Sequence, residues 1–263
     1  MMAQILTLFG YGEAGRTFAR AAGWESQAQV FDAKTDVPKT RDAILADYHA
    51  DGVSGATNPV DALRNSVIIL SLVTADQALA VAQNAATHIS CNALYFDMNS
   101  VAPDTKRAAA KLIDAAGGRY VDVAVMAPVQ PARLAVPLIL SGPHANEGAA
   151  ALADLGFTNV RVVTGEVGRA SSIKMIRSIM VKGQEALTAE MMLAAEAAGV
   201  AGEVLSSLGD GWDTKAAYNL ERMRTHGNRR AAEMEEVAKT LTALGVEPVI
   251  TTGTIRLQKG MAA

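Results

Sequence analysis

One stretch near the start of the chain decides the fold: Gln4-Ile5-Leu6-Thr7-Leu8-Phe9-Gly10-Tyr11-Gly12-Glu13-Ala14-Gly15. It joins an apolar run, typical of a buried strand, to the pattern G-x-G-x-x-G and then to a helical segment. The first glycine permits a tight turn, the second lets a pyrophosphate approach the backbone, and the third lets helix and strand pack closely. The stretch predicts a dinucleotide-binding βαβ unit. The residues expected at the cofactor are Gly10, Tyr11, Gly12, Glu13, Ala14 and Gly15.

An acidic residue supports this prediction. Asp32 ends the second apolar run, 22 residues after Gly10, where a carboxylate accepts hydrogen bonds from the adenosine ribose hydroxyls. A 2′-phosphate there would meet like charge, so Asp32 favours NAD. Lys34, two residues on, could reach a 2′-phosphate and keeps NADP as an alternative. A glycine turn in an α/β protein without cofactor is the remaining interpretation.

Short runs rich in Val, Ile, Leu and Phe alternate with alanine-rich helical segments as far as about residue 164, a pattern typical of βαβ units. Strands are expected over 4–10, 27–32, 66–71, 93–97, 120–125, 137–141 and 159–163. Helices are expected near 14–22, 75–86, 103–116 and 145–155. After Gly168 the apolar period becomes helical throughout. We therefore expect an α/β, Rossmann-type, mostly parallel sheet in residues 1–166. Residues 167–263 should form a long interdomain helix and a small all-helical domain for substrate binding and dimerisation.

Composition narrows the class of protein. The 263 residues carry a net charge of −3 and half are hydrophobic, which is enough for a full core and gives no field that would attract nucleic acid or a membrane. No signal peptide or spanning helix is recognisable at the N-terminus. The single cysteine, Cys91, allows no internal disulfide and indicates a reducing, cytoplasmic setting. No His, Cys, Asp and Glu cluster has metal-ligand spacing, so no metal is expected. The apolar faces of the helical domain predict a homodimer.

A second stretch suggests chemistry: Gly165-Glu166-Val167-Gly168-Arg169-Ala170-Ser171-Ser172-Ile173-Lys174 opens a long apolar helix. At 100° per residue, Lys174 and Ser178 share one face, with Arg177 on its flank. A lysine beside a nicotinamide can lose its charge through desolvation and the nearby cationic ring, and can then act as a general base toward an alcohol. Ser178 would orient the reacting oxygen or the lysine. On spacing alone, a solvated surface lysine is equally supported.

With these motifs the chain resembles the β-hydroxyacid dehydrogenase family, which includes 3-hydroxyisobutyrate and 6-phosphogluconate dehydrogenases. The resemblance covers about residues 4–200 and includes the loop Leu72-Val73-Thr74 and the segment Asp97-Met98-Asn99-Ser100-Val101-Ala102-Pro103. It implies cofactor contacts for Leu72, Val73, Thr74 and Asn99, and substrate contacts for Ser100, Asp122 and Met126. The family pattern G-x-x-G-x-G-x-x-x-K-x-x-x-N implies catalysis by Lys174, with Ser178 in place of the asparagine. The C-terminal part is similar to a helical domain of unassigned function.

The chain departs from the family at the substrate. Relatives hold a carboxylate with D-A-P-V-S-G-G, whereas this chain reads Asp122-Val123-Ala124-Val125-Met126-Ala127-Pro128 and lacks those donors. Phosphogluconate enzymes place a carboxylic acid seven residues after the lysine, where this chain has Val181, which argues against oxidative decarboxylation. Arg177 is the candidate for an alternative anion clamp, or it caps an interdomain contact. The basic cluster Arg222–Arg230 is a further candidate and is more simply explained by solvated helix charges.

The combined interpretation is an NAD(P)-dependent dehydrogenase or reductase acting on CH–OH. It would transfer hydride between nicotinamide and a hydroxyl or carbonyl carbon of a small, acidic or neutral substrate, with Lys174 as general acid/base. Two alternatives stay open. One is an imine- or opine-type reductase on the same plan, against which the lysine argues. The other is a regulatory protein that binds NAD without turnover.

Overall fold

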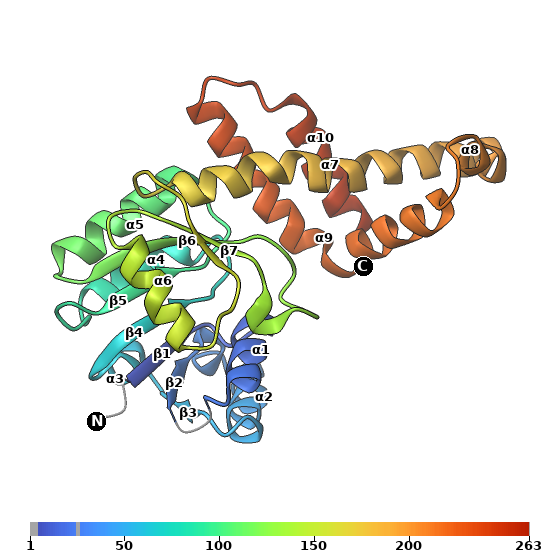
Figure 1. Cartoon of the computed structure of the whole chain (residues 1–263). Coiled ribbons are helices and arrows are strands. Elements are labelled where there is room, and N and C mark those ends of the chain that lie inside the picture. The colour runs from blue at the N-terminus through green and yellow to red at the C-terminus, as the bar shows by residue number, and fades with distance from the viewer. Residues whose placement is uncertain (1–4, 25–26, 263) are drawn as a thin grey trace. The chain divides into compact units, whose positions relative to one another are not determined.

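The structure is a computed structural model that describes residues 5–24 and 27–262. The chain divides into two compact units, Met1–Lys174 and Met175–Ala263, and each is described by itself. The first unit is a Rossmann-like α/β domain and the second is helical (Figure 1). The fold class expected from the sequence is therefore confirmed.

Eight strands form one sheet in the first unit, in the order β3-β2-β1-β4-β5-β6-β7-β8. Neighbouring strands from β3 to β6 are parallel, β7 runs antiparallel to β6, and β8 is parallel to β7. Connections through helices place the carboxyl ends of β1, β2, β4 and β5 at one edge, where ligands bind in sheets of this kind. The strands are β1 Ile5–Phe9, β2 Ala28–Phe31, β3 Ser54–Gly55, β4 Ser66–Ser71, β5 Leu94–Asp97, β6 Arg119–Val125, β7 Leu138–Ser141 and β8 Val160–Val162.

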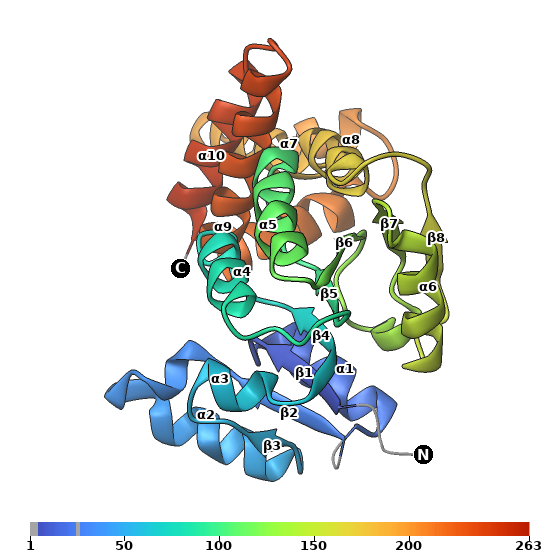
Figure 2. The same cartoon turned by 90° about the vertical axis from the view of Figure 1, so that its left-hand side faces the viewer.

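Side-chain alternation divides the core between the two faces of this sheet. One face carries Leu8, Leu70 and Phe96 and packs against helices α1, α2 and α6. The other carries Phe9, Ile69 and Tyr95 and packs against α3, α4 and α5. Both faces are covered, which explains why the strands read as nearly continuous apolar runs. Figure 2 shows α4 and α5 side by side. The helices are α1 Glu13–Ala22, α2 Pro38–Ala50, α3 Pro59–Leu63, α4 Ala78–Ala86, α5 Pro103–Ala115 and α6 Ala145–Asp154, with short 3-10 turns η1 Ala33–Thr35 and η2 Arg133–Ala135.

The second unit is built on α7, a 30-residue helix over Arg169–Ala198 that begins in the first unit. It continues through α8 Ala201–Ser207, α9 Trp212–Ala243 and α10 Val249–Met261. Helices α9 and α10 approach closely, since a Cβ added to Gly227 would lie 2.3 Å from the backbone oxygen of Gln258. A small apolar core of Met175, Met234, Val237 and Leu241 holds this unit together.

The seven expected strands and the helices of the sheet domain are present, with ends shifted by up to three residues; residue 4, in the first expected strand, lies outside the described residues. The structure adds α2, α3 and β3, which the sequence did not indicate. Only Ile44 and Tyr48 of the 13 residues in α2 are buried, so its periodic signal is weak. β3 has two residues and is too short to show an alternation.

Candidate active site

The glycine loop has the geometry that its motif requires. Gly10 has a φ of +88°, and a Cβ there would lie 2.5 Å from the backbone oxygen of Leu72. A Cβ on Gly15 would lie 2.7 Å from the backbone oxygen of Gly10, so the third glycine lets α1 pack against the strand end. A Cβ on Gly12 would meet nothing within 4 Å, which leaves open space beside the first turn of α1. No side chain caps that turn. The residues therefore fit a pyrophosphate at the helix N-terminus.

Asp32 lies against the same loop. Its Oδ2 accepts a hydrogen bond from the backbone N–H of Tyr11 at 2.8 Å, and its Oδ1 accepts one from Lys34 at 2.9 Å. A carboxylate has about four lone-pair positions, so acceptor capacity remains for the two hydroxyls of a ribose. The two backbone bonds fix the direction of the carboxylate at the end of β2.

Tyr11 contributes its backbone to the loop, because its ring is 1% exposed and its hydroxyl donates to Asp51 Oδ2 at 3.0 Å. Arg16 and Arg20 also donate to Asp51, at 2.9 and 2.7 Å. Burial raises the pKa of Asp51, but the bonds from Arg16, Arg20 and Tyr11 outweigh it and hold that pKa below its usual value of 3.8. Burial, reinforced by Asp51, raises the pKa of Tyr11. This cluster ties α1 to the end of α2, behind the glycine loop.

The loops after β4 and β5 are tied together by Asn99. Its Oδ1 accepts from the backbone N–H of Val73 at 2.7 Å, and its Nδ2 donates to Ser71 Oγ at 2.9 Å and Asp97 Oδ1 at 2.8 Å. Asn99 is 3% exposed, so its amide shapes the loop Leu72-Val73-Thr74. The cofactor surface at this edge would come from the loop itself, where Thr74 is exposed and Leu72 and Val73 are partly exposed.

A buried charge network underlies these loops. Lys106 is fully buried and donates to Asp97 Oδ1 at 3.0 Å, and its Nζ lies 3.6 Å from Asp122 Oδ1. The Tyr120 hydroxyl donates to Asp97 Oδ2 at 2.7 Å. Burial, with added repulsion from Asp97, raises the pKa of Tyr120. Sequence reasoning missed Lys106, because an apolar helix face around a lysine looks the same whether the lysine is buried or solvated.

Asp122 caps the first turn of α7. Its Oδ2 accepts from the backbone N–H groups of Gly168 at 3.0 Å and Ser171 at 3.2 Å, and from Ser141 Oγ at 3.0 Å. Ser141 Oγ in turn accepts from the N–H of Ala170 at 2.9 Å. The paired residues Asp122 of β6 and Ser141 of β7 thus hold the start of α7. Asp122 is completely buried and its Oδ2 holds this turn, which is a positioning role. The substrate contact expected for Asp122 stays a prediction.

The other expected site residues lie as follows. Lys174 is partly exposed on α7, one turn after the capped residue Ser171. Met126 is partly buried and packs against an apolar cluster around Ala170, and Ser100 is partly exposed at the end of the β5 loop. In the helical unit, the sequence places Ser178 one turn after Lys174 along the continuous helix α7. Ser178 is buried, whereas Arg177 is exposed.

The basic cluster of α9 is divided in its roles. Arg230 is buried and makes a two-pronged ion pair with Glu185 of α7 through Nε and Nη2, the Nε bond measuring 2.8 Å. Arg229 is exposed and pairs with Glu233 at 2.8 Å. Arg230 is therefore committed to the interior of the helical unit, which speaks against it as a substrate clamp.

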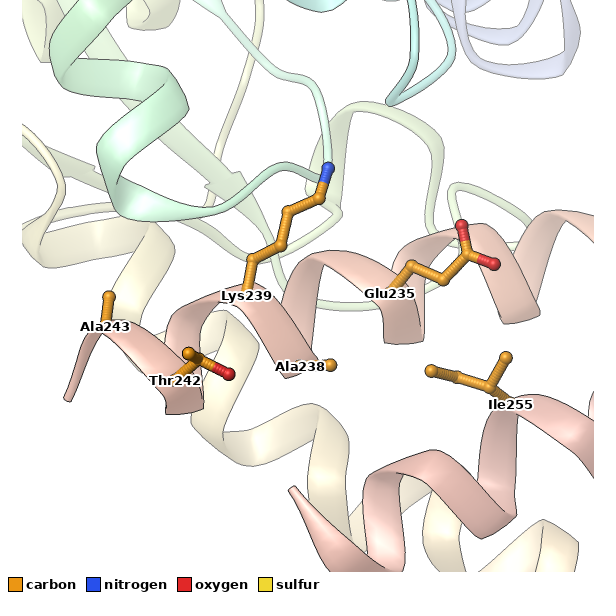
Figure 3. Close-up of a pocket in the computed structure, with 6 residues that line it drawn as sticks. All are labelled: Glu235, Ala238, Lys239, Thr242, Ala243 and Ile255. Carbon is orange, nitrogen blue, oxygen red and sulfur yellow. The ribbon is translucent and has the colours of Figure 1, made fainter. Parts of the chain in front are cut away.

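An open groove between α9 and α10 has a volume of about 530 Å³. Figure 3 shows the residues that line it, which are Glu235, Ala238, Lys239, Thr242, Ala243 and Ile255. Its two charged side chains are engaged at its rim, Lys239 with Glu236 and Glu235 with Lys259. It holds none of the residues expected at the cofactor or the substrate. The residues expected at the cofactor lie at the strand ends of the first unit instead.

Within 5–24 and 27–262, no group of three or more His, Cys, Asp or Glu side chains could hold a metal ion. No helix in the same residues has the length and apolar character needed to cross a membrane.

Comparison with known families matches the first unit to the NAD binding domain of 6-phosphogluconate dehydrogenase, over residues 6–156. The chain belongs to this family. Residues 195–261 match a second family, described as a domain of unknown function (DUF1932). The combination of an NAD-binding domain with this helical domain agrees with the resemblance seen in the sequence.

Three relatives are similar to this chain over most of their length. A conserved hypothetical protein from Sinorhizobium meliloti is 36% identical, with 98% of this chain and 88% of that one covered and a TM-score of 0.75. The conserved protein MTH1747 is 30% identical, with 97% of this chain and 96% of that one covered and a TM-score of 0.71. It is described as a protein of unknown function with structural similarity to 3-hydroxyacid dehydrogenases. An uncharacterised 28.5 kDa protein from Methanothermus fervidus is 30% identical over 195 residues, 72% of this chain and 74% of the relative.

More distant structures share the fold. They include 3-hydroxyisobutyrate dehydrogenase of Mycobacterium tuberculosis, 14% identical over 98% of this chain and 94% of that one, with a TM-score of 0.75. They also include a reductive aminase of Aspergillus terreus solved with NADPH, 15% identical over 98% and 93%, with a TM-score of 0.62. At these identities the likeness shows a shared fold, that of hydroxyacid dehydrogenases and reductases.

Proposed function

We propose that the protein is an NAD-dependent oxidoreductase that transfers hydride between nicotinamide and the hydroxyl-bearing or carbonyl carbon of a small substrate. The observation that carries the proposal is the cap of α7 by Asp122 and Ser141. It fixes the first turn of the helix that bears Lys174 to strands β6 and β7, in the same sheet that carries the glycine loop. An amine is thereby held in a defined place relative to a dinucleotide site.

Several features support the cofactor part. Gly12 leaves space for a pyrophosphate, the first turn of α1 lacks a side-chain cap, and the Asp32 carboxylate is aimed by two backbone N–H groups. Asp32 would accept from the ribose hydroxyls and repel a 2′-phosphate, which favours NAD over NADP. Thr74 and its loop, tied by Asn99, would flank the nicotinamide. When bound, the nicotinamide supplies the acceptor or donor of hydride.

Lys174 is proposed as the general acid/base. In the oxidative direction its neutral Nζ would take the hydroxyl proton of the substrate as hydride leaves the same carbon, and in the reductive direction its ammonium would return that proton to the carbonyl oxygen. Ser178, one turn later on α7, would donate a hydrogen bond to the reacting oxygen and orient it.

Arg177 is proposed to bind the anion of an acidic substrate. The family donors are absent at Met126-Ala127-Pro128, because Pro128 has no N–H and Met126 no hydroxyl. Arg177 is exposed and follows Lys174 by three residues in the chain, next to the catalytic face of α7. A guanidinium can hold a carboxylate through two parallel hydrogen bonds. Ser100 and Met126 would contribute contacts from the loops after β5 and β6.

The test is a turnover screen at 340 nm, with NAD⁺ and NADP⁺ against hydroxy acids, aryl alcohols and sugar acids, and with the reduced cofactors against ketones with and without amines. Turnover of an alcohol or ketone is expected. Lys174→Ala should lower kcat by about 10²- to 10⁴-fold with nucleotide affinity retained. Lys111→Ala, the same change at an exposed lysine of α5, is the matched control. Turnover of a ketone only when an amine is present would favour an imine reductase. Tight nucleotide binding without turnover of any substrate would favour a regulatory protein.

We also propose a homodimer formed through α7. Ile176, Met180 and Leu187 are 49%, 63% and 70% exposed and lie within about 40° of one another around the helix. Such an apolar stripe on a 30-residue helix is suited to a second copy of the chain. Light scattering should give twice the chain mass. Leu187→Glu should shift it to monomer, while Ala43→Glu on α2 should leave it unchanged; a monomeric parent protein would refute the proposal.

A further inference from the structure

A buried ion pair in the helical unit contacts the hydroxyl of Ser178. Lys182 follows Ser178 by four residues on α7, and its Nζ lies 3.2 Å from Ser178 Oγ. The same Nζ lies 2.9 Å from Glu233 Oε2 on α9. Lys182 is buried, with 6% of its surface exposed. Its position on the helix is rotated by about 80° from that of Lys174. Side chains on a helix lean toward its N-terminus, which explains how the ammonium reaches the preceding turn.

The chemistry of this contact fixes a direction. An ammonium has three donors and no acceptor, so Ser178 Oγ must be the acceptor in the bond with Lys182. The hydroxyl hydrogen of Ser178 is then directed toward a different partner. A hydroxyl that accepts from a cation is polarised and becomes a stronger donor. A serine side chain otherwise rotates among three positions, so the lysine selects its orientation.

Lys182 is itself held in place. Glu233 receives Lys182 on Oε2 and Arg229 on Oε1, at 2.9 and 2.8 Å. One turn farther along α7, Glu185 binds Arg230 of α9 and accepts from Gln258 of α10 at 3.0 Å. These bonds join three helices around the ammonium. The lysine therefore has a rigid anchor on one side and the serine hydroxyl on the other.

We infer that Lys182, anchored by Glu233, is a positioning residue that orients and polarises the Ser178 hydroxyl for the reacting oxygen of the substrate. This inference rests on the proposed role of Ser178 and deepens it. An ammonium at this distance alters the charge at position 178 whatever its role, so a thiol there tests the contact itself and needs no substrate. A purely structural salt bridge between α7 and α9 would instead affect turnover equally with and without the Ser178 hydroxyl.

The experiment replaces the hydroxyl by a thiol whose ionisation reports the local charge. In a Cys91→Ser background, which removes the single native cysteine, Ser178→Cys introduces a thiol whose pKa is read from thiolate absorbance at 240 nm. Gln184→Cys, at an exposed position of the same helix, is the reference. Lys182→Met should raise the pKa of the thiol at 178 by about one unit or more, because a nearby cation favours the thiolate. Glu233→Gln should lower it, because a competing negative charge is lost.

The opposite signs make the result decisive. Either variant can be measured alone if the other does not fold, as judged by far-UV circular dichroism. A thiol pKa at position 178 that moves by less than about 0.3 units in each folded variant overturns the inference, as does a shift of the same sign in both. These outcomes do not depend on turnover, so they are distinct from a failure of the proposed oxidoreductase activity.

Once a substrate is known, a double-mutant cycle completes the test. Lys182→Met should lower kcat by about 10-fold in the parent protein and by less than 2-fold in a Ser178→Ala background, because the lysine then has no hydroxyl to orient. The KM for the nucleotide should stay the same in all four proteins. Equal losses in both backgrounds would assign Lys182 a structural role and refute the inference.

Discussion

Removal of the Asp122 carboxylate should loosen the start of α7 and destabilise the sheet domain. In Asp122→Ala, the N–H groups of Gly168 and Ser171 lose their acceptor, and Lys106 loses one of two carboxylates near its buried ammonium. Breaking a buried charged network by removing one partner costs about 3–5 kcal/mol. Asp122→Asn keeps one oxygen for the cap but turns a neutral amide toward Lys106, and should cost about 2–3 kcal/mol. Ser141→Ala should cost about 1–2 kcal/mol.

Thermal unfolding followed by circular dichroism measures these differences. For a unit of this size, roughly 2–4 °C of Tm accompanies each kcal/mol, so Asp122→Ala should lower the Tm by roughly 6–20 °C. Hydrogen exchange should show lost protection at Gly168 and Ser171 before the rest of the sheet. The control is Asp104→Asn, because Asp104 is exposed and pairs with Arg107 in the same helix, where a surface pair contributes about 0–1 kcal/mol. A Tm for Asp122→Ala within about 2 °C of the parent would refute the capping argument.

Three further predictions concern the cofactor, the substrate and acid stability. Titration should show tighter binding of NADH than NADPH, and Asp32→Ala should narrow or invert that preference; tighter NADPH binding by the parent protein would point to Lys34 instead. Arg177→Met should raise the KM for an acidic substrate by roughly 10- to 100-fold and leave the KM for a neutral substrate unchanged. If the KM for an acidic substrate does not change in the variant, the substrate anion is bound elsewhere. The folded-state pKa of Asp51 lies below 3.8, so its stabilisation is full above that pH and is lost as pH falls through the folded value. Asp51→Asn should therefore lower the Tm at pH 7 and leave it nearly equal to that of the parent protein in strong acid. A difference in Tm between parent and variant that does not depend on pH would contradict this.

Local sequence patterns were sufficient to predict most strands and helices of the sheet domain. A glycine spacing, a strand of continuous apolar residues and a helix of regular period each involve neighbours in the chain, so their signal is visible without tertiary contacts. The requirement for glycine at positions 10 and 15, the end of β2 at Asp32 and the long helix after Gly168 belong to this class. The direction of a strand cannot be predicted in this way, because an antiparallel β7 has the same alternation of side chains as a parallel one.

The remaining site features depend on pairs of residues far apart in the chain. Asp122 reaches Gly168 over 46 residues, and Asn99 reaches Val73 over 26. Nothing local to Asp122 distinguishes a carboxylate that caps a distant helix from one that binds a substrate, and the sequence therefore suggested the second role. The role of Lys182 is likewise not visible in its local sequence, because its ion pair with Glu233 forms only when α9 packs beside α7. The sequence by itself determined the dinucleotide fold and the helix of Lys174. Only tertiary packing decided which charged side chains are buried and committed to one another, because burial and long-range pairing have no periodic signature.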